Sequence, residues 1–146
     1  MRGNLFSLAY LVSNAGALLI LLISIWYKRA GRIIVGFLFL FAALVNAWQA
    51  IFKPDIYNVY ELLAALPVYE YLVAEVFLNH ITFYIILLMV VQLAIGIGIV
   101  YNRKIAMIAG IVYLLVLAPL GAGSSFPCTV ILAVAVMLLL NRGKQN

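Results

Sequence analysis

Long apolar runs separated by short polar stretches dominate the sequence. Three of these runs, residues 5–27, 33–52 and 81–101, each have about the 20 residues that a helix needs to cross the hydrocarbon core of a bilayer. Inside lipid every backbone N–H and C=O must be satisfied within its own segment, and a helix satisfies them. We therefore expect each of the three runs to be a membrane-spanning helix.

The first run, residues 5–27, has a competing interpretation as a cleavable signal peptide. A secretory signal carries its positive charge before a shorter apolar segment, whereas here the larger charge cluster follows the run, beginning at Lys28 and Arg29. Trp26 and Tyr27 just before that cluster are typical of an interfacial anchor. This pattern favours a permanent span.

The last apolar stretch, residues 105–140, is too long for one span and is interrupted in its middle. Proline, glycine and serine gather there, at Pro119, Gly121, Gly123, Ser124, Ser125 and Pro127. Such a cluster ends a helix, so we divide the stretch into two short spans, 105–120 and 126–140. A single broken helix is the alternative.

Residues 55–78 differ from the runs because charged residues and Pro67 punctuate an apolar sequence. Apolar positions recur at helical spacing on both sides of the proline. They are Ile56, Val59, Tyr60, Leu63 and Leu66 before it, and Tyr69, Leu72, Val73 and Val76 after it. Asp55 can cap the start of a helix here. We expect two short amphipathic helices on the membrane or capping the bundle; alternatively, the second half begins a longer third span.

Composition supports a membrane protein. The chain is 68% apolar and 9% charged, whereas about a quarter of the residues in a soluble domain are charged. Its net charge of +5 does not indicate nucleic acid, because the cations lie at the ends of the apolar runs. A lipid bilayer is therefore the expected environment, and nucleic acid is not an expected partner.

The cations also decide between five spans and four. With five spans, one side of the membrane receives Lys28, Arg29, Arg32, Arg103, Lys104, Arg142 and Lys144, and the other receives only Arg2 and Lys53. With four spans the division is five against four. Because cytoplasmic loops carry the excess of Lys and Arg, we expect five spans in the plasma membrane. The N-terminus is then outside, the C-terminus is cytoplasmic, and the amphipathic segment lies on the outer face.

Three amides in the expected second and third spans are candidates for contacts between helices. Asn46 and Gln49 are three residues apart and so share one helix face. An interhelical hydrogen bond is their expected role. Gln92 lies near the middle of the third span, followed by Ala94 and Gly98, a pair of small residues that lets another helix approach closely.

Two groups of polar residues are candidate functional residues at the outer face. A binding site at the outer mouth of the bundle would draw on Asn46, Gln49, His80, Gln92 and Cys128. A docking surface for a partner would draw on Glu61, Glu70 and Glu75. The alternative is that these polar groups only solvate the interfacial helices. One histidine and one cysteine fit neither a metal site nor a catalytic constellation, so neither is predicted.

Residues 32–140 resemble the DoxX-like family of small membrane proteins. The resemblance rests on residues 32–42 (RIIVGFLFLFA), the KPD at 53–55, Leu66 with Pro67, residues 92–100 (QLAIGIGIV) before Asn102 and Arg103, and the turn before Phe126 and Pro127. It implies a four-helix bundle, to which the first span would be an addition. It also implies a link to redox and sulfur metabolism, including a thiosulfate:quinone oxidoreductase and hence a possible quinone.

The chain departs from this family at two charged positions. Gln92 stands where the family has a glutamate, and no basic residue lies around Asn46 and Ala47. These losses argue against inherited redox chemistry. We therefore expect an accessory, non-catalytic integral subunit of a larger redox-linked membrane complex. The alternatives are a quinone-linked oxidoreductase component and a small-solute carrier.

Overall fold

The computed structural model describes residues 8–58, 60, 64–120 and 126–142. Within these residues the protein is helical, which confirms the predicted all-α class. The five long helices are α1 (Leu8–Trp26), α2 (Lys28–Phe52), α5 (Ile81–Val100), α6 (Lys104–Leu117) and α7 (Cys128–Arg142). The shorter elements are η1 (Pro54–Asn58), α4 (Pro67–Tyr71), η2 (Leu72–Phe77), η3 (Leu78–His80) and η4 (Ala118–Leu120).

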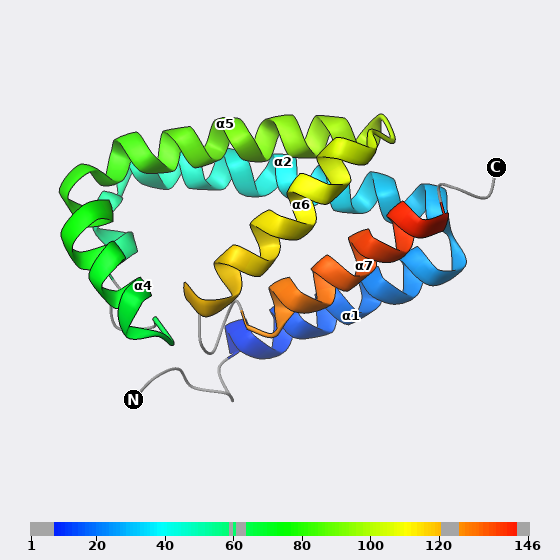
Figure 1. The fold of residues 1–146 in the computed structure, drawn as a ribbon, viewed down its shortest axis with the longest axis horizontal. Coiled ribbons are helices and arrows are strands. Elements are labelled where there is room, and N and C mark those ends of the chain that lie inside the picture. Colours follow the sequence, from blue (N-terminus) through cyan, green and yellow to red (C-terminus); the bar gives the residue numbers. More distant parts are fainter. Residues whose placement is uncertain (1–7, 59, 61–63, 121–125, 143–146) are drawn as a thin grey trace.

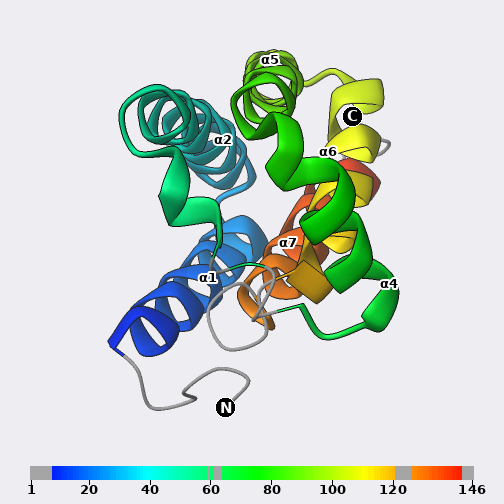
Figure 2. The same cartoon turned by 90° about the vertical axis from the view of Figure 1, so that its left-hand side faces the viewer.

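The long helices form two pairs with α6 between them. Helices α2 and α5 lie side by side along one edge, and α1 and α7 lie side by side along the other (Figure 1). Helix α6 crosses between the pairs and contacts both α5 and α7, as the end view in Figure 2 also shows. The core is therefore shared by all five helices and contains Val35, Phe39, Ile99, Met107 and Val136.

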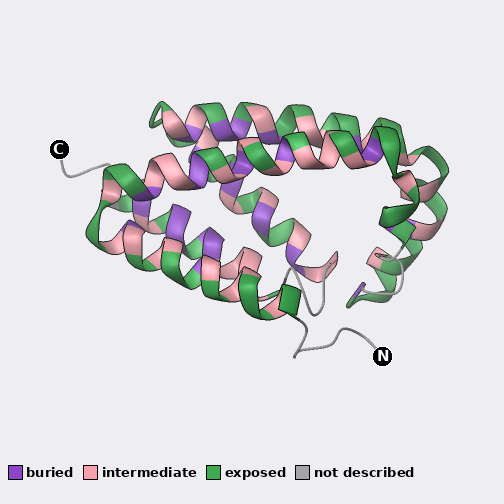
Figure 3. Ribbon diagram, turned by 180° about the vertical axis from the view of Figure 1, so that it is seen from behind, coloured by how far each residue is buried: buried purple, intermediate pink, exposed green. Residues whose placement is uncertain are grey.

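The outer surface of the bundle is apolar. Buried residues face the interior in Figure 3, while large hydrophobic side chains such as Phe37 (60% exposed) and Ile105 (83% exposed) point outward. Three segments are long and apolar enough to cross a membrane: Leu8–Trp26, Lys28–Phe52 and Pro67–Val100. Lys104–Leu120 and Cys128–Asn141 are shorter apolar helices. The surface is thus compatible with a lipid bilayer, and the division of residues 105–140 into two helices is confirmed.

The turn between α1 and α2 is tighter than the sequence indicated. Tyr27 alone separates the two helices, so Lys28 and Arg29 lie in the first turn of α2 rather than in a loop before residue 33. The close return is possible because Gly31 packs directly on the fully buried Ser24. A Cβ at position 31 would lie 2.5 Å from the Ser24 hydroxyl oxygen, so a larger residue would force the helices apart.

Glycine against glycine sets the contact between α2 and α5. A Cβ on Gly96 would lie 2.9 Å from the Gly36 carbonyl oxygen, and one on Gly36 would lie 2.5 Å from Cγ2 of Val100. The expected pair of small residues was different and is wrong in part: Ala94 is exposed, and Gly98 packs against Ala106 of α6. Small residues do let these backbones approach, but at Gly96, between the two predicted positions.

Helix α5 ends in a tight turn that aims α6 back across the bundle. Asn102 has a positive φ of 59°, a conformation that asparagine tolerates better than most residues. The Arg103 N–H donates to the Gly98 carbonyl oxygen at 2.8 Å and closes the turn. With this geometry α5 ends at Val100 and α6 begins at Lys104.

The segment from Pro54 to His80 covers one end of the bundle. Pro67 begins a helical path that runs through α4, η2, η3 and α5 to Val100, so the alternative of a long third helix describes it better than a separate amphipathic helix does. The path bends (Figure 1), because η2 is a π-helix and His80 has non-helical angles of −139° and 44°. The predicted first helix is represented by the 3-10 helix η1; residues 59 and 61–63 lie outside the described residues.

Burial within this segment follows the predicted pattern only in part. Val73 is buried as expected, but Ile56 is 43% exposed and Val76 is 40% exposed. Tyr57, which was not on the predicted face, is buried at 4% exposed. The expected stripe assumed continuous α-helix from residue 55, whereas the tighter 3-10 helix at 54–58 turns Tyr57 inward instead.

Most of the described cations lie at the end of the bundle opposite to the described carboxylates, whereas Lys53 lies with the carboxylates. The α1–α2 turn, the α5–α6 turn and the end of α7 share one end (Figure 1). Its described cationic side chains are Lys28, Arg29, Arg32, Arg103 and Lys104. The other end carries the exposed carboxylates Asp55, Glu70 and Glu75. The cations therefore gather on one side as the sequence predicted, while the orientation relative to a membrane stays a prediction.

Candidate functional site

A hydrogen bond between two amides joins α2 and α5 deep in the bundle. The Asn46 Nδ2 donates to Gln92 Oε1 at 3.1 Å. Gln92 is only 4% exposed and is one of two buried polar residues among those described. Burying an amide without a partner is costly, so the two side chains satisfy one another. The predicted interhelical hydrogen bond of Asn46 is confirmed.

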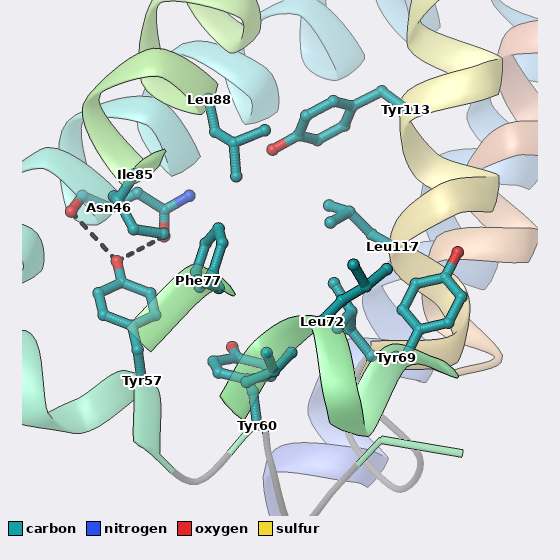
Figure 4. A pocket seen from close by; sticks show the side chains of 12 residues that line it. Asn46, Tyr57, Tyr60, Tyr69, Leu72, Phe77, Ile85, Leu88, Tyr113 and Leu117 are labelled. Atoms are coloured by element: carbon teal, nitrogen blue, oxygen red, sulfur yellow. Dashed lines mark hydrogen bonds between the residues drawn. The ribbon is translucent and has the colours of Figure 1, made fainter. Parts of the chain in front are cut away.

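The Tyr57 hydroxyl lies beside this amide pair. Its hydroxyl lies 3.2 Å from the Asn46 carbonyl oxygen, 3.4 Å from Asn46 Oδ1 and 3.5 Å from Gln49 Oε1. Figure 4 shows it reaching from η1 to Asn46. Asn46, Gln49, Tyr57 and Gln92 therefore form one polar group, which we call the amide cluster.

A cavity of about 250 Å³ lies beside the amide cluster. It is enclosed by α2, α5, α6 and the Pro54–His80 segment (Figure 4). Its described lining is Asn46, Tyr57, Tyr60, Tyr69, Leu72, Val73, Phe77, Ile85, Leu88, Tyr113, Leu117 and Leu120. An engineered apolar cavity of about 150 Å³ holds benzene, so this space is large enough for a substituted single ring.

We call this space the outer cavity. Four tyrosines give it most of its polar groups. The Tyr113 hydroxyl points into the space (Figure 4) and has no hydrogen-bond partner among the described residues. Tyr69 instead donates its hydroxyl to the Val116 carbonyl oxygen at 3.1 Å, which fastens α4 to α6. Tyr60 stacks on Tyr57 with ring centroids 6.1 Å apart. The cavity thus offers neutral hydroxyl and amide groups on otherwise apolar walls.

Burial alters the acidity of Tyr57 and Tyr60, which lie outside the long helices. Burial, reinforced by the neighbouring Tyr60, raises the pKa of Tyr57 from 10.0 to about 12. Burial also raises the pKa of Tyr60. Desolvation disfavours the charged phenolate, so both groups are neutral hydrogen-bonding groups at physiological pH. Ionic recognition by these side chains is therefore excluded.

A second cavity of about 420 Å³, which we call the inner cavity, lies on the other side of the amide pair. It is lined mainly by aliphatic side chains of α1, α2, α6 and α7, with Gln92 and Cys128 at its wall. Tyr113 and Leu117 line both cavities. Asn46 faces the outer cavity and its partner Gln92 faces the inner one, so the Asn46–Gln92 hydrogen bond marks the boundary between them.

The structure brings together most of the binding residues that the sequence singled out. Asn46, Gln49 and Gln92 belong to one cluster, and Cys128 shares the inner cavity with Gln92. His80 does not join them: it is exposed at the start of α5 and is not among the described lining of either cavity. The predicted mouth therefore assembles without its histidine.

The docking residues lie where a partner or water can reach them. Glu70 and Glu75 are exposed on the Pro67–His80 path, and Glu61 lies outside the described residues. Among the described residues, no group of three or more His, Cys, Asp or Glu is placed to hold a metal ion. What the described residues offer is thus a neutral cavity and a separate acidic surface.

Comparison with protein-family models, curated proteins and solved structures finds no match to this chain. The resemblance to the DoxX-like family therefore stays an expectation from sequence motifs. The amide cluster and the two cavities are the features of the described structure that bear on function.

Sequence reasoning missed the tyrosines that shape the site. Tyr69 is 47 positions from its hydrogen-bond partner Val116, and Tyr113 packs on Phe39 of a distant helix. Tyrosine in an apolar run resembles an interfacial anchor or a core residue. The available signal was the concentration of tyrosine in residues 57–71, which exceeds what anchoring requires.

Proposed function

We propose that this chain is a five-span membrane protein that binds a neutral, ring-containing lipophilic molecule as an accessory subunit of a larger, redox-linked membrane complex. The observation that carries the proposal is the outer cavity beside the amide cluster. Its described walls are aromatic and aliphatic, and they include hydroxyls and an amide but no acidic or basic side chain. Ligand pockets combine apolar walls with a few placed polar groups in this way.

The wall chemistry indicates the class of ligand. An ion would leave its charge unpaired in this lining, which is unfavourable in an apolar interior. A flat ring can pack against Tyr60 and Phe77, and its oxygen can accept a hydrogen bond from the Tyr113 hydroxyl. A quinone headgroup meets these requirements, which favours a quinone-linked component as the second candidate.

The arrangement in the membrane follows from length and charge. We place all five long helices across the bilayer, although α6 and α7 are short, because the α1–α2 turn, the α5–α6 turn and the end of α7 share one end of the bundle. Cations at the α1–α2 and α5–α6 turns support an orientation in which that end of the bundle faces the cytoplasm across the plasma membrane. The Pro54–His80 segment then covers the outer face, with Glu70 and Glu75 available to dock another subunit.

Chemistry on the ligand is assigned to that partner. The amide cluster supplies hydrogen bonds and no side chain that transfers protons near neutral pH, since the pKa of Tyr57 is raised to about 12. Passage of a small solute is the third candidate. It has less support, because the described walls of both cavities are mostly apolar and offer a polar solute few hydrogen-bonding groups.

A cavity-filling variant tests the binding proposal. Leu88 points into the outer cavity (Figure 4), whereas its neighbour Leu87 is 52% exposed on the outer surface. In lipid nanodiscs, Leu88→Trp should abolish the binding of a fluorinated phenol probe followed by fluorine NMR. Leu87→Trp adds the same side chain on the lipid-facing side and should leave binding unchanged. Equal binding by both variants would rule out the outer cavity as the site.

Isolation of the protein tests the accessory role. Mild-detergent purification from the native membrane should recover other subunits with this chain. Charge reversal of the outer surface with Glu70→Lys and Glu75→Lys should reduce that recovery. A stable, catalytically active particle that contains only this chain would contradict the accessory role and leave the binding proposal standing.

A further inference from the structure

The two cavities share a wall rather than lying at separate places in the bundle. Tyr113 and Leu117 of α6 line both. The Tyr113 ring packs against Phe39 of α2, with 5.9 Å between the ring centroids. On the α2–α5 side the boundary is the Asn46–Gln92 hydrogen bond. Tyr113, Leu117 and the Asn46–Gln92 pair thus lie where the described walls of the two cavities meet.

The two spaces differ in chemical character. The outer cavity has four tyrosines and Asn46 on its wall. The inner cavity is larger. Ser13, Gln92 and Thr129 lie on its wall, but aliphatic residues such as Val12, Ile20, Leu38, Leu114 and Leu132 make up most of it. A ring with polar substituents fits the first environment, and a hydrocarbon chain fits the second.

The inner cavity also reaches the lipid-facing surface. Val12 of α1 lines it and is nevertheless 63% exposed. Gly16, one turn further along α1, lies on the same wall, and a Cβ built there would meet nothing within 4 Å. A chain that enters from lipid therefore has room beside α1, and a chain longer than the cavity can continue into the bilayer.

We propose that the two cavities hold a single amphiphilic molecule, with its polar ring in the outer cavity beside Asn46 and its alkyl chain passing Tyr113 and Leu117 into the inner cavity. This inference rests on the proposed binding function and adds the chain to the ligand. The occupant is accordingly a tailed ring compound of membrane origin. A small water-soluble aromatic molecule would use only half of the available space.

Two probes and two leucine variants test the inference. The probes are 4-fluorophenol and 4-fluoro-2-decylphenol, measured by fluorine NMR on the full chain in nanodiscs, with empty nanodiscs to subtract partitioning into lipid. Gly16→Leu fills the inner cavity at a position where the backbone has open space. Ala15→Leu adds the same side chain at an exposed position on the same helix.

Gly16→Leu should weaken binding of the decyl probe about tenfold or more, because several CH2 groups lose their buried surface. It should leave binding of the short probe unchanged, and Ala15→Leu should change neither. Equal decyl-probe binding by the wild-type and Gly16→Leu proteins would overturn the inference while keeping the outer-cavity site. If the wild-type protein binds neither probe, the proposed binding function itself fails.

Discussion

The Asn46 side chain of α2 donates a 3.1 Å hydrogen bond to the Gln92 side chain of α5, from a position 46 residues earlier in the chain. This bond links the two most extensively packed helices of the bundle at the level of both cavities. The two amides therefore connect the stability of the fold to the shape of the candidate site.

Breaking the amide pair should cost stability in a way that a double mutant reveals. Gln92→Leu leaves Asn46 Nδ2 without its partner, so the free energy of unfolding should fall by about 0.5–2 kcal/mol. The double variant Asn46→Leu/Gln92→Leu should lose less than the sum of the two single variants. Denaturant titration in bicelles measures this, with Met89→Leu as a volume-conserving control on α5. Additive losses would show that the two amides do not interact.

Gly96 and Gly16 should respond oppositely to the same substitution. In Gly96→Ala the new methyl lies 2.9 Å from the Gly36 carbonyl oxygen, so α2 and α5 must separate, and we expect a loss of about 1–3 kcal/mol. In Gly16→Ala the methyl enters open space, and the better helix propensity of alanine should add up to about 1 kcal/mol. Thermal unfolding of both variants in the same detergent compares them. Similar midpoints for the two would contradict the close α2–α5 contact.

Tyr57 predicts a loss of stability at alkaline pH. Its pKa is raised from 10.0 unfolded to about 12 folded, so the folded chain holds the phenolic proton more tightly. The contribution is fully present below pH 10 and is lost as pH rises from about 10 to about 12. Ultraviolet difference absorbance between the wild-type and Tyr57→Phe proteins should show one phenolate forming late in this range. Ionisation of that group near pH 10 would contradict its burial.

The membrane orientation can be tested with single cysteines. In a Cys128→Ala background, Glu70→Cys and Lys104→Cys place one thiol at each end of the bundle, at exposed positions. A membrane-impermeant maleimide added to intact cells should label position 70 at once and position 104 only after permeabilisation. The reverse pattern would place the N-terminus in the cytoplasm and the Pro54–His80 segment inside.

The hydrophobic pattern predicts the helices well because the thickness of the membrane sets the length of each apolar run. Bilayer thickness demands about 20 apolar residues, and α5 (Ile81–Val100) falls within one residue of the expected run. Helix pairing was not accessible in the same way. Hydropathy does not say that α2 packs on α5, and the choice of Gly36 and Gly96 over Ala94 depends on the rotation of each helix about its axis.

The site could be predicted only where polar side chains interrupt an apolar run. Asn46, Gln49 and Gln92 stand out because amides are costly in lipid, and the fold does join them. Tyr57 could not be identified from the sequence, because a tyrosine near a helix end is typical of an interfacial anchor. Its inward direction depends on the 3-10 geometry of η1. His80 stood out as the only histidine in the chain, but rarity in the sequence did not place it in the cavity wall.

The glycine contact between α2 and α5 also limits how the outer cavity can open. Backbone lies against backbone at Gly36 and Gly96, so these two helices form a stiff wall with little room to slide. On the opposite side, α4 is fastened to α6 by the Tyr69–Val116 bond, and the Ala65 N–H donates to the Pro119 carbonyl oxygen. A change in the width of the outer cavity would therefore have to come from the α4–α6 side, which side-chain and backbone hydrogen bonds hold, rather than from the α2–α5 wall.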